Sequence, residues 1–424
     1  MCDDLGDADL VILNTCHIRE KAAEKVYSEL GRIKKIKFKK KDQGSEIILA
    51  VAGCVAQAEG EEILRRAPYV DLVFGPQTYH DLPEMIARVT RKSGAILNTD
   101  FPYKAKFDHL PEVSSNSELL DGASAFLTIQ EGCDKFCAFC VVPYTRGSEY
   151  SRPVRDILDE AKRLVDFGVK EVTLLGQNVN SFHGADGKGT EWRLGRLIRE
   201  ISEIDGIERI RYTTSYPADM DDDLISAHGE VDELMPFLHL PVQSGSNRVL
   251  KSMKRRHNSD QYRNIIERLV NARPDIALSS DFIVGFPGET DADFSETMKL
   301  VKDVGFIQAY SFKYSQRPGT PAASMDYQIA EELKIERLEI LQEELNKQQL
   351  AFNESCVGRT MPVLLDRLGR FEGQIIGRSP YMQPVHVSAP DHFLGTVTSL
   401  RIDAGKANSL AGSLQYTHES ENVI

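Results

Sequence analysis

The chain has 424 residues, of which 41% are hydrophobic and 27% charged. This composition is typical of about three globular domains and excludes a disordered or low-complexity protein. No window holds the roughly 18 uncharged apolar residues of a membrane helix, and the N-terminus lacks the features of a signal peptide. We therefore expect a cytoplasmic protein without a membrane partner. Seven cysteines are few for this length and odd in number, which argues against a disulfide scaffold.

The net charge of −13 would repel nucleic acid if it were spread evenly, so RNA binding would need local basic patches. One such patch is present between Arg32 and Lys41, where seven of ten residues are basic. A solvated helix end and loop is the simplest interpretation of this run.

Residues 8–110 predict apolar strands that alternate with helices, hence a parallel sheet covered by helices. Strands are expected at 8–16, 46–53 and 71–74, and helices at 20–35, 59–66 and 82–91. Cys16 and Cys54 each follow a strand, which places both at the carboxyl edge of the sheet, where open α/β folds carry their sites. Residues 92–122 are mixed and polar and predict a linker.

Residues 124–320 repeat a strand-then-helix unit six times. The expected strands are 125–130, 171–176, 209–214, 237–242, 277–284 and 309–314. Six units favour a partial barrel, although the pattern alone leaves a doubly wound sheet open. One long polar helix is expected at 327–350.

Residues 357–418 predict a small antiparallel barrel with strand-like runs divided by Gly, Pro and Asn. The expected strands are 361–366, 371–377, 386–387 and 394–402. This segment has six basic and four acidic residues, a net charge of +2, so the remainder of the chain carries −15.

Cys133, Cys137 and Cys140 form a C-x3-C-x2-C motif directly after the first expected barrel strand. Three thiolates on one loop can hold three corners of an iron–sulfur cubane and leave the fourth iron open for a ligand. Structural zinc is the alternative, but it takes four closed ligands and no fourth Cys or His lies in the loop. Three unligated thiols are the remaining possibility.

This motif resembles that of the radical S-adenosylmethionine (SAM) superfamily, and the surrounding residues are similar to those of the MiaB-type methylthiotransferases. The similar segments are residues 14–22, 53–57, 74–78, 131–147 and 176–180. The resemblance covers nearly the whole chain.

The family's plan implies an N-terminal methylthiotransferase domain, a linker, a radical SAM barrel and a TRAM domain, which is an OB-like RNA-binding barrel. Placed on this sequence, these are residues 1–110, 111–123, 124–353 and 357–418. The fold class expected is thus α/β, with a parallel α/β domain, a partial (βα)6 barrel and a small β-barrel.

The resemblance also implies a reaction. A [4Fe–4S] cluster on Cys133, Cys137 and Cys140 binds SAM, and the 5′-deoxyadenosyl radical takes hydrogen from C2 of N6-isopentenyladenosine 37 in the tRNA anticodon loop. A second cluster in the N-terminal domain supplies sulfur, and a second SAM supplies the methyl group. An electron donor such as flavodoxin or ferredoxin and a monomeric enzyme are expected.

By position in the superfamily, three strand-end segments are expected to contact SAM, with tight βα turns as the alternative interpretation. The expected residues are Gly176, Gln177, Asn178, Gln243, Ser244, Gly285 and Glu289.

The sequence departs from the family at its beginning. The family's domain opens with a strand, a helix and a third cluster cysteine, whereas here only Cys16 and Cys54 stand in family positions. Cys2 lies in the turn before the first strand. We therefore expect an exposed apolar face or edge on the N-terminal sheet, a weakly held second cluster and iron near four per chain. The alternatives in function are an RNA-binding chain that cleaves SAM without inserting sulfur, or a methylthiotransferase with another substrate.

Overall fold

The structure is a computed structural model that describes residues 2, 4–16, 20–91, 94–101, 107 and 122–415, with the side chains of residues 20–23 excepted. The chain divides into two compact units. The first is residues 1–112 with 132–134 and 140–148, and the second is residues 113–131, 135–139 and 149–424. Most of the expected linker at 111–123 and the last three residues of the expected domain at 357–418 lie outside the described residues.

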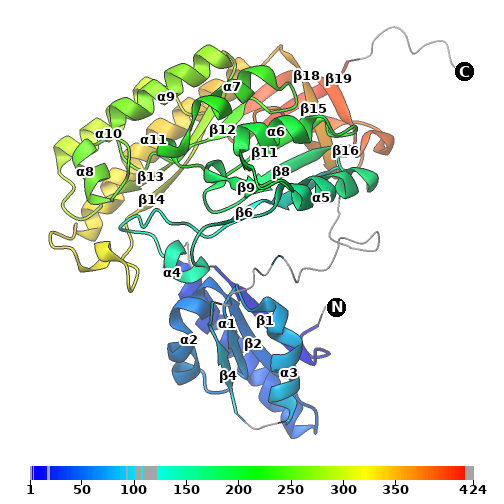
Figure 1. The fold of residues 1–424 in the computed structure, drawn as a ribbon, viewed down its shortest axis with the longest axis vertical. Helices are drawn as coiled ribbons and strands as arrows, with labels where there is room; N and C mark the ends of the chain where they lie inside the picture. Colours follow the sequence, from blue (N-terminus) through cyan, green and yellow to red (C-terminus); the bar gives the residue numbers. More distant parts are fainter. Residues whose placement is uncertain are drawn as a thin grey trace, which may run out of the picture. The chain divides into compact units, whose positions relative to one another are not determined.

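The first unit is built on a parallel sheet in the strand order β1-β2-β3-β4 (Figure 1). Its elements are β1 (Leu10–Thr15), α1 (Glu20–Asp42), β2 (Ile48–Gly53), α2 (Cys54–Arg66), β3 (Leu72–Phe74), η1 (Tyr79–Asp81), α3 (Leu82–Arg91), β4 (Ile96–Asn98) and α4 (Val142–Arg146). Strand β2 is buried on both faces because successive side chains point to opposite sides. Leu49 and Val51 pack with residues of α1 and α2, whereas Ala50 and Ala52 pack with residues of α3.

Three sequence predictions for this unit were wrong in detail. The linker expected at residues 92–122 contains strand β4. Its three residues, Ile-Leu-Asn, are too short a run to show a period. Helix α1 continues to Asp42, because lysine is a good helix former and stabilises a helix C-terminus. The basic run is therefore helical. Helix α2 begins at Cys54 and has non-helical dihedral angles at Glu59, so its first turn was missed.

Strand β1 lies at one edge of the described sheet. The side chain of Ile12 is 40% exposed, and Leu10 and Leu13 are half-buried. A groove of about 570 Å³ runs along this edge between Cys2 and Ile12. An apolar edge is thus exposed in the part of the chain that the structure describes.

The second unit contains the strand-helix repeat and the C-terminal barrel. Its elements up to the long helix are β5 (Ser124–Thr128), β6 (Gln130–Glu131), β7 (Tyr150–Ser151), α5 (Val154–Asp166), β8 (Glu171–Leu175), η3 (Val179–Ser181), β9 (His183–Ala185), β10 (Glu191–Arg193), α6 (Leu194–Ser202), β11 (Arg209–Tyr212), η4 (Pro217–Asp219), α7 (Asp222–Glu230), β12 (Phe237–His239), α8 (Asn247–Ser252), α9 (Ser259–Ala272), β13 (Ala277–Val284), α10 (Asp291–Val304), β14 (Gln308–Lys313), η5 (Pro321–Ser324) and α11 (Glu331–Ser355). No helix in the described ranges is both long and apolar enough to cross a membrane.

The six parallel strands follow one another in sequence order, as β5-β8-β11 and β12-β13-β14. A parallel bridge between Ile210 and Leu234 links the two sheets. A doubly wound sheet reverses its strand order at a switch point, and this order does not reverse. The partial barrel is therefore confirmed. The expected strands agree with the observed ones to within a few residues, because buried parallel strands are continuous apolar runs.

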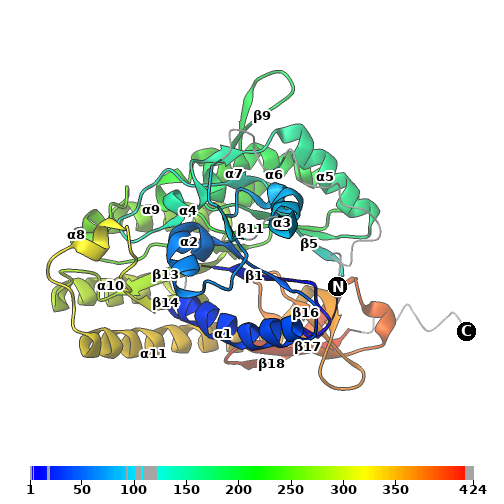
Figure 2. The same cartoon turned by 90° about the horizontal axis from the view of Figure 1, so that it is seen from below.

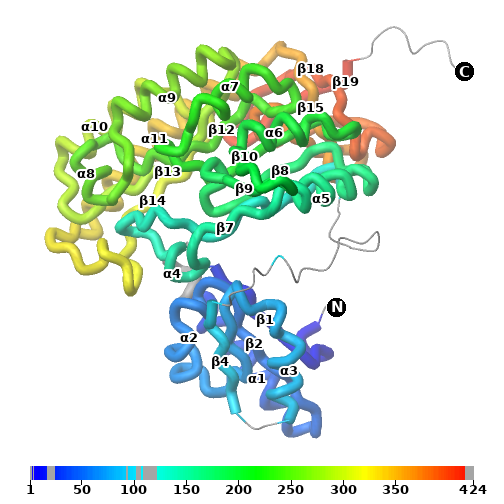
Figure 3. The backbone as a smooth tube through the Cα atoms, viewed as in Figure 1, coloured from blue at the N-terminus to red at the C-terminus, as the bar shows by residue number. Residues whose placement is uncertain are grey.

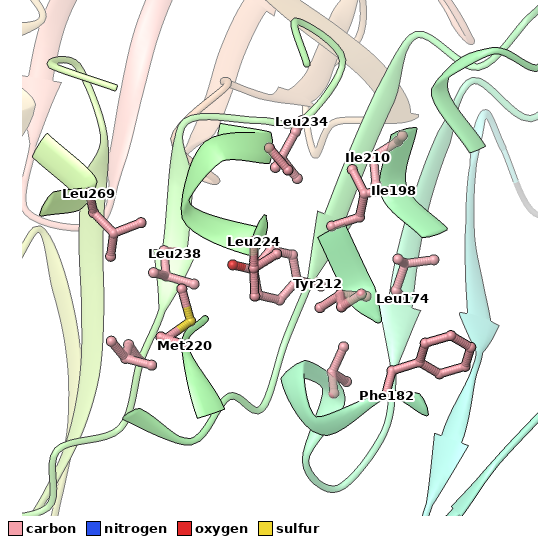
Figure 4. Packing of buried hydrophobic residues seen from close by; sticks show 14 of the residues in the cluster. Leu174, Phe182, Ile198, Ile210, Tyr212, Met220, Leu224, Leu234, Leu238 and Leu269 are labelled. Atoms are coloured by element: carbon pink, nitrogen blue, oxygen red, sulfur yellow. The ribbon is translucent and has the colours of Figure 1, made fainter. Parts of the chain in front are cut away.

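The barrel core is formed by strand residues that pack against the covering helices. Figure 4 shows Leu174, Ile210 and Leu238 from three strands beside Ile198 of α6 and Leu224 of α7. Helix α11 packs along α10 and β14 (Figure 2) and leads into the C-terminal barrel (Figure 3).

The C-terminal barrel closes in the order β15-β16-β17-β19-β18. Its elements are β15 (Thr360–Leu368), β16 (Gln374–Arg378), β17 (Pro384–Ser388), η6 (Asp391–Phe393), β18 (Val397–Lys406) and β19 (Ser409–Leu414). The small barrel is confirmed with two corrections. Strand β19 was missed because Ser-Leu-Ala-Gly-Ser-Leu lacks β-branched residues. It also pairs in parallel with β17, so the barrel is not wholly antiparallel.

A buried ionic network joins this small barrel to the beginnings of strands β8 and β11. The carboxylate of Glu171 on β8 accepts from Nε of Arg211 at 2.9 Å and lies 3.6 Å from Arg209 and 3.7 Å from Arg378. Arg209 also donates to the carbonyl oxygens of Pro362 and Arg378, at 2.7 and 2.9 Å. Burial lowers the pKa of Arg209 to about 10, against the opposing effect of Glu171.

Candidate functional site

The cysteine motif lies on the loop that follows β5 and β6. Cys133, directly after Glu131 and Gly132, donates its main-chain N–H to the carbonyl oxygen of Gly147 at 3.2 Å. Cys133 and Cys140 are half-buried, and Cys137 is buried. Strand β6 pairs with β7, so the second unit holds the two ends of this loop next to each other. The loop thus leaves the barrel at the end where its strands terminate.

The backbone next to Cys137 is anchored from two directions. The N–H of Ala138 donates to the carbonyl of Met253 at 2.9 Å, and the carbonyl of Ala138 accepts from Ala322 at 2.9 Å. The side chain of Cys137 has a cationic neighbour, since Nη1 of Arg255 donates to its Sγ atom at 3.6 Å. The contact of Arg255 with Cys137 could not be predicted from the sequence, because the two residues are 118 positions apart.

The segment after β8 is tied to the first barrel strand through Gln130. Its Oε1 atom accepts from the main-chain N–H groups of Gln177 and Asn178, at 2.8 and 3.0 Å. A Cβ atom on Gly176 would overlap this oxygen, so only glycine permits the approach. The amide nitrogen of Asn178 donates to Asp219 at 2.8 Å, while its Oδ1 atom is buried and has no hydrogen-bond partner among the described residues.

The segment after β12 is held mainly by internal hydrogen bonds. Gln243 has a left-handed backbone with φ of 76° and exchanges main-chain hydrogen bonds with β13, to Asp281 and from Ile283, both at 2.9 Å. The hydroxyl of Ser244 is fully buried and lies 3.2 Å from that of Thr297. The backbone of Gln243 therefore has the unusual conformation, and the side chain of Ser244 has an internal partner.

The turn after β13 is closed by a buried carboxylate. Glu289 accepts from the N–H of Gly285 at 2.9 Å and from Nη1 of Arg337 at 2.8 Å. Burial raises the pKa of Glu289, and the Gly285 and Arg337 contacts oppose this rise. The structure thus gives Glu289 a place inside the turn, with helix α11 supplying its counter-ion.

The two cysteines of the first unit follow neighbouring strands. Thr15 and Gly53 are paired across β1 and β2, so Cys16 and Cys54 begin at the same edge of the sheet. The hydroxyl of Thr15 donates to the carbonyl of Ala52 at 2.6 Å and accepts from Val55 at 3.1 Å. Cys16 is exposed and Cys54 is half-buried.

Within the described ranges, no three Cys, His, Asp or Glu side chains converge as ligands of one metal ion. A cubane differs from a single ion in this respect, because each thiolate binds a different iron. Three cysteines within eight residues of one loop fit the ligand chemistry of a [4Fe–4S] cluster.

Comparison with known families matches three segments of the chain. Residues 127–301 match the radical SAM superfamily, residues 1–75 the uncharacterized protein family UPF0004, and residues 354–414 the TRAM domain.

Two solved structures share the fold at low sequence identity. The radical SAM methyltransferase TsrM from Kitasatospora setae aligns with a TM-score of 0.55 at 14% identity, over 74% of this chain and 64% of its own. The cobalamin-dependent radical SAM enzyme OxsB aligns with a TM-score of 0.52 at 18% identity, over 80% of this chain and 48% of its own. This chain thus spans less than two thirds of either protein, and the likeness shows the fold alone.

One relative matches along almost the whole chain. It is the tRNA-2-methylthio-N(6)-dimethylallyladenosine synthase of Agrobacterium fabrum strain C58, which is 58% identical over 408 residues, 96% of this chain and 90% of the relative. Identity of this extent, together with the radical SAM and TRAM segments, shows the family. The chain belongs to the tRNA-2-methylthio-N(6)-dimethylallyladenosine synthases, which are radical SAM methylthiotransferases.

Proposed function

We propose that this chain converts N6-isopentenyladenosine 37 of tRNA to its 2-methylthio derivative. The observation that carries the proposal is the 58% identity to the synthase from Agrobacterium fabrum along 96% of the chain. The cysteine loop after the first barrel strand also supports the proposal, because its three thiols are suited to bind an iron–sulfur cluster.

The proposed cluster ligands are Cys133, Cys137 and Cys140. When bound there, a [4Fe–4S] cluster supplies one electron to SAM and an open iron for its amino and carboxylate groups. The chain's own contribution is to fix the loop. The contacts of Ala138 with Met253 and Ala322 hold the backbone beside Cys137, so that the position of this ligand is set before the cofactor binds.

The proposed SAM contacts are the seven strand-end residues expected from sequence, and they do not have equal support. Asn178 has the strongest, because its buried Oδ1 atom can accept a hydrogen bond from an ammonium group. Gly176 and Gln177 place main chain at the same strand end. Gln243 offers a left-handed backbone. For Ser244, Gly285 and Glu289 the internal hydrogen bonds support an indirect role, in shaping the turns.

The proposed second cluster would lie in the first unit, with Cys16 and Cys54 among its ligands. The pairing of the preceding residues, Thr15 and Gly53, supports this because it places both cysteines at the same edge of the sheet. The proposed tRNA contact is the C-terminal barrel, whose charge of +2 over residues 357–418 contrasts with the acidic remainder. A monomer in the cytoplasm with flavodoxin or ferredoxin as the electron donor completes the proposal.

The test is a reaction of anaerobically reconstituted, reduced protein with SAM and tRNA that carries N6-isopentenyladenosine 37. Mass spectrometry of the digested nucleosides should show the 2-methylthio derivative, and tRNA with plain adenosine 37 should stay unmodified. Release of 5′-deoxyadenosine without methylthiolated tRNA would favour the alternative in which the chain cleaves SAM but does not insert sulfur. Modification of another nucleoside would contradict the proposed substrate.

A further inference from the structure

The guanidinium of Arg255 is the feature of the site that neither the motif nor the family comparison assigns. It follows helix α8 and lies beside the middle cysteine of the motif, with Nη1 donating to Sγ of Cys137 at 3.6 Å. In the loaded enzyme that sulfur would be a thiolate bound to iron. We propose that Arg255 raises the reduction potential of the [4Fe–4S] cluster by donating a charged hydrogen bond to the Cys137 sulfur, an inference that rests on the proposed function.

Arg255 is fixed in place by two contacts besides the one with the sulfur. Its Nη2 atom donates to the carbonyl oxygen of Pro241 at 2.6 Å. Its guanidinium also lies over the ring of Tyr216, with Cζ 4.3 Å from the ring centroid. A planar guanidinium can satisfy a carbonyl, a ring face and a sulfur together, which a lysine ammonium cannot.

Tyr216, the platform of this contact, is itself held on three sides. Its main-chain N–H donates to Oδ1 of Asn180 at 2.8 Å, and its carbonyl accepts from the same side chain at 2.9 Å. Its hydroxyl accepts from the main-chain N–H of Arg256 at 2.8 Å. Tyr216 is 4% exposed, so its ring has little freedom to move away from Arg255.

The charge of Arg255 is not neutralised by a carboxylate among the described residues. A second cation, Lys135, lies 5.4 Å from the Tyr216 ring centroid, but it forms an ion pair with Asp219 at 2.7 Å. His257 packs edge-on against the same ring, and burial lowers its pKa to about 3, so its imidazole is neutral at pH 7. Arg255 is therefore a cation beside the sulfur without a carboxylate partner in the described part of the chain.

Hydrogen bonds to the cysteine sulfurs are among the factors that set the potential of an iron–sulfur cluster. One-electron reduction adds negative charge to the cluster and its thiolates. A cation that donates to one of those sulfurs stabilises the reduced form and makes the potential less negative. Because Arg255 contacts neither SAM nor RNA in this account, it acts through Cys137 and is a positioning residue.

The experiment is an anaerobic redox titration of the reconstituted protein, followed by the EPR signal of the reduced cluster. A Cys16→Ala, Cys54→Ala background removes the proposed ligands of the second cluster, so that the signal comes from the cluster at Cys133, Cys137 and Cys140. Arg255→Met should lower the equilibrium constant for one-electron reduction of the cluster at least tenfold. The reduction potential should therefore become more negative by at least about 59 mV. Arg255→Lys should lie between Arg255→Met and the parent.

Arg256→Met is the matched control, because it removes a neighbouring charge that has no contact with Cys137. Its potential should equal that of the parent. A parent-like potential in Arg255→Met would overturn the inference while leaving the proposed function intact. A parent without a four-iron EPR signal would instead contradict the proposed function. Arg255→Gln keeps an amide donor without the charge and is titrated beside Arg255→Met. Loss of iron in every Arg255 variant would also overturn the inference, since Arg255 would then hold the loop.

Discussion

The buried carboxylate of Glu171 gives the sharpest test of how the C-terminal barrel is joined to the strand-helix repeat. Its side chain is 0% exposed and lies within 3.7 Å of the guanidinium groups of Arg209, Arg211 and Arg378. Glu171→Gln keeps the shape but removes the negative charge. The pKa of Arg209, about 10, keeps that group charged at pH 7, so uncompensated cations stay buried.

The cost can be worked from the geometry. One pair of unit charges at about 4 Å attracts by about 4 kcal/mol at an effective dielectric constant of about 20, and most of that gain is offset by desolvation. Removing one partner from a buried ion pair typically costs about 3–5 kcal/mol, because the other charge stays buried. We therefore expect Glu171→Gln to lower the free energy of unfolding by at least about 3 kcal/mol.

The assay is urea unfolding followed by fluorescence of Trp192, the single tryptophan, which lies in the core of the strand-helix repeat. Glu208→Gln is the matched control, since Glu208 pairs with Lys170 at 2.5 Å with both side chains at least 34% exposed. An exposed pair is worth about 0–1 kcal/mol. If Glu171→Gln cost no more than Glu208→Gln, the network would not stabilise the junction.

Further predictions concern the sheet edge and the acid range. Gly53 has φ of 94° and a Cβ there would overlap the carbonyl of Thr15, so Gly53→Ala should cost about 1–3 kcal/mol in urea unfolding. Gly31→Ala, in helix α1 with open space around it, should instead stabilise by about 0.5–1 kcal/mol, and equal effects would refute the strain argument. His228 is fully buried against Tyr212, and burial lowers its pKa to about 3. Below about pH 6.5 this histidine is protonated in the unfolded chain but stays neutral in the folded chain. It therefore lowers the free energy of unfolding by about 2 kcal/mol at about pH 5. Urea unfolding of His228→Gln should lack that part of the decline between these two pH values, and an unchanged pH dependence would contradict this origin.

Strand positions in the barrel could be predicted because parallel strands buried on both faces are continuous apolar runs. Their order could not, since pairing depends on contacts between distant residues such as Ile210 and Leu234. Strands β4 and β19 escaped for different reasons. The first has only three residues, and the second has a composition that is poor for strands.

The motif cysteines could be placed on a loop from their spacing, and the structure puts that loop after β6. Their surroundings could not be foreseen. Arg255 reaches Cys137 from a separate loop in which Lys254 has a left-handed backbone with φ of 58°, and no sequence period encodes such a turn. The counter-ion of Glu289 likewise comes from a distant element, since Arg337 lies on helix α11.

In the proposed site, the thiolates of Cys133, Cys137 and Cys140 bind three irons of the cluster and leave the fourth open for SAM. The most direct measurement is EPR spectroscopy of the reduced, reconstituted protein before and after addition of SAM, with Cys137→Ala as the control. The spectrum of the parent should change when SAM is added, and the spectrum of the Cys137→Ala variant should not. An identical spectrum with and without SAM would contradict it.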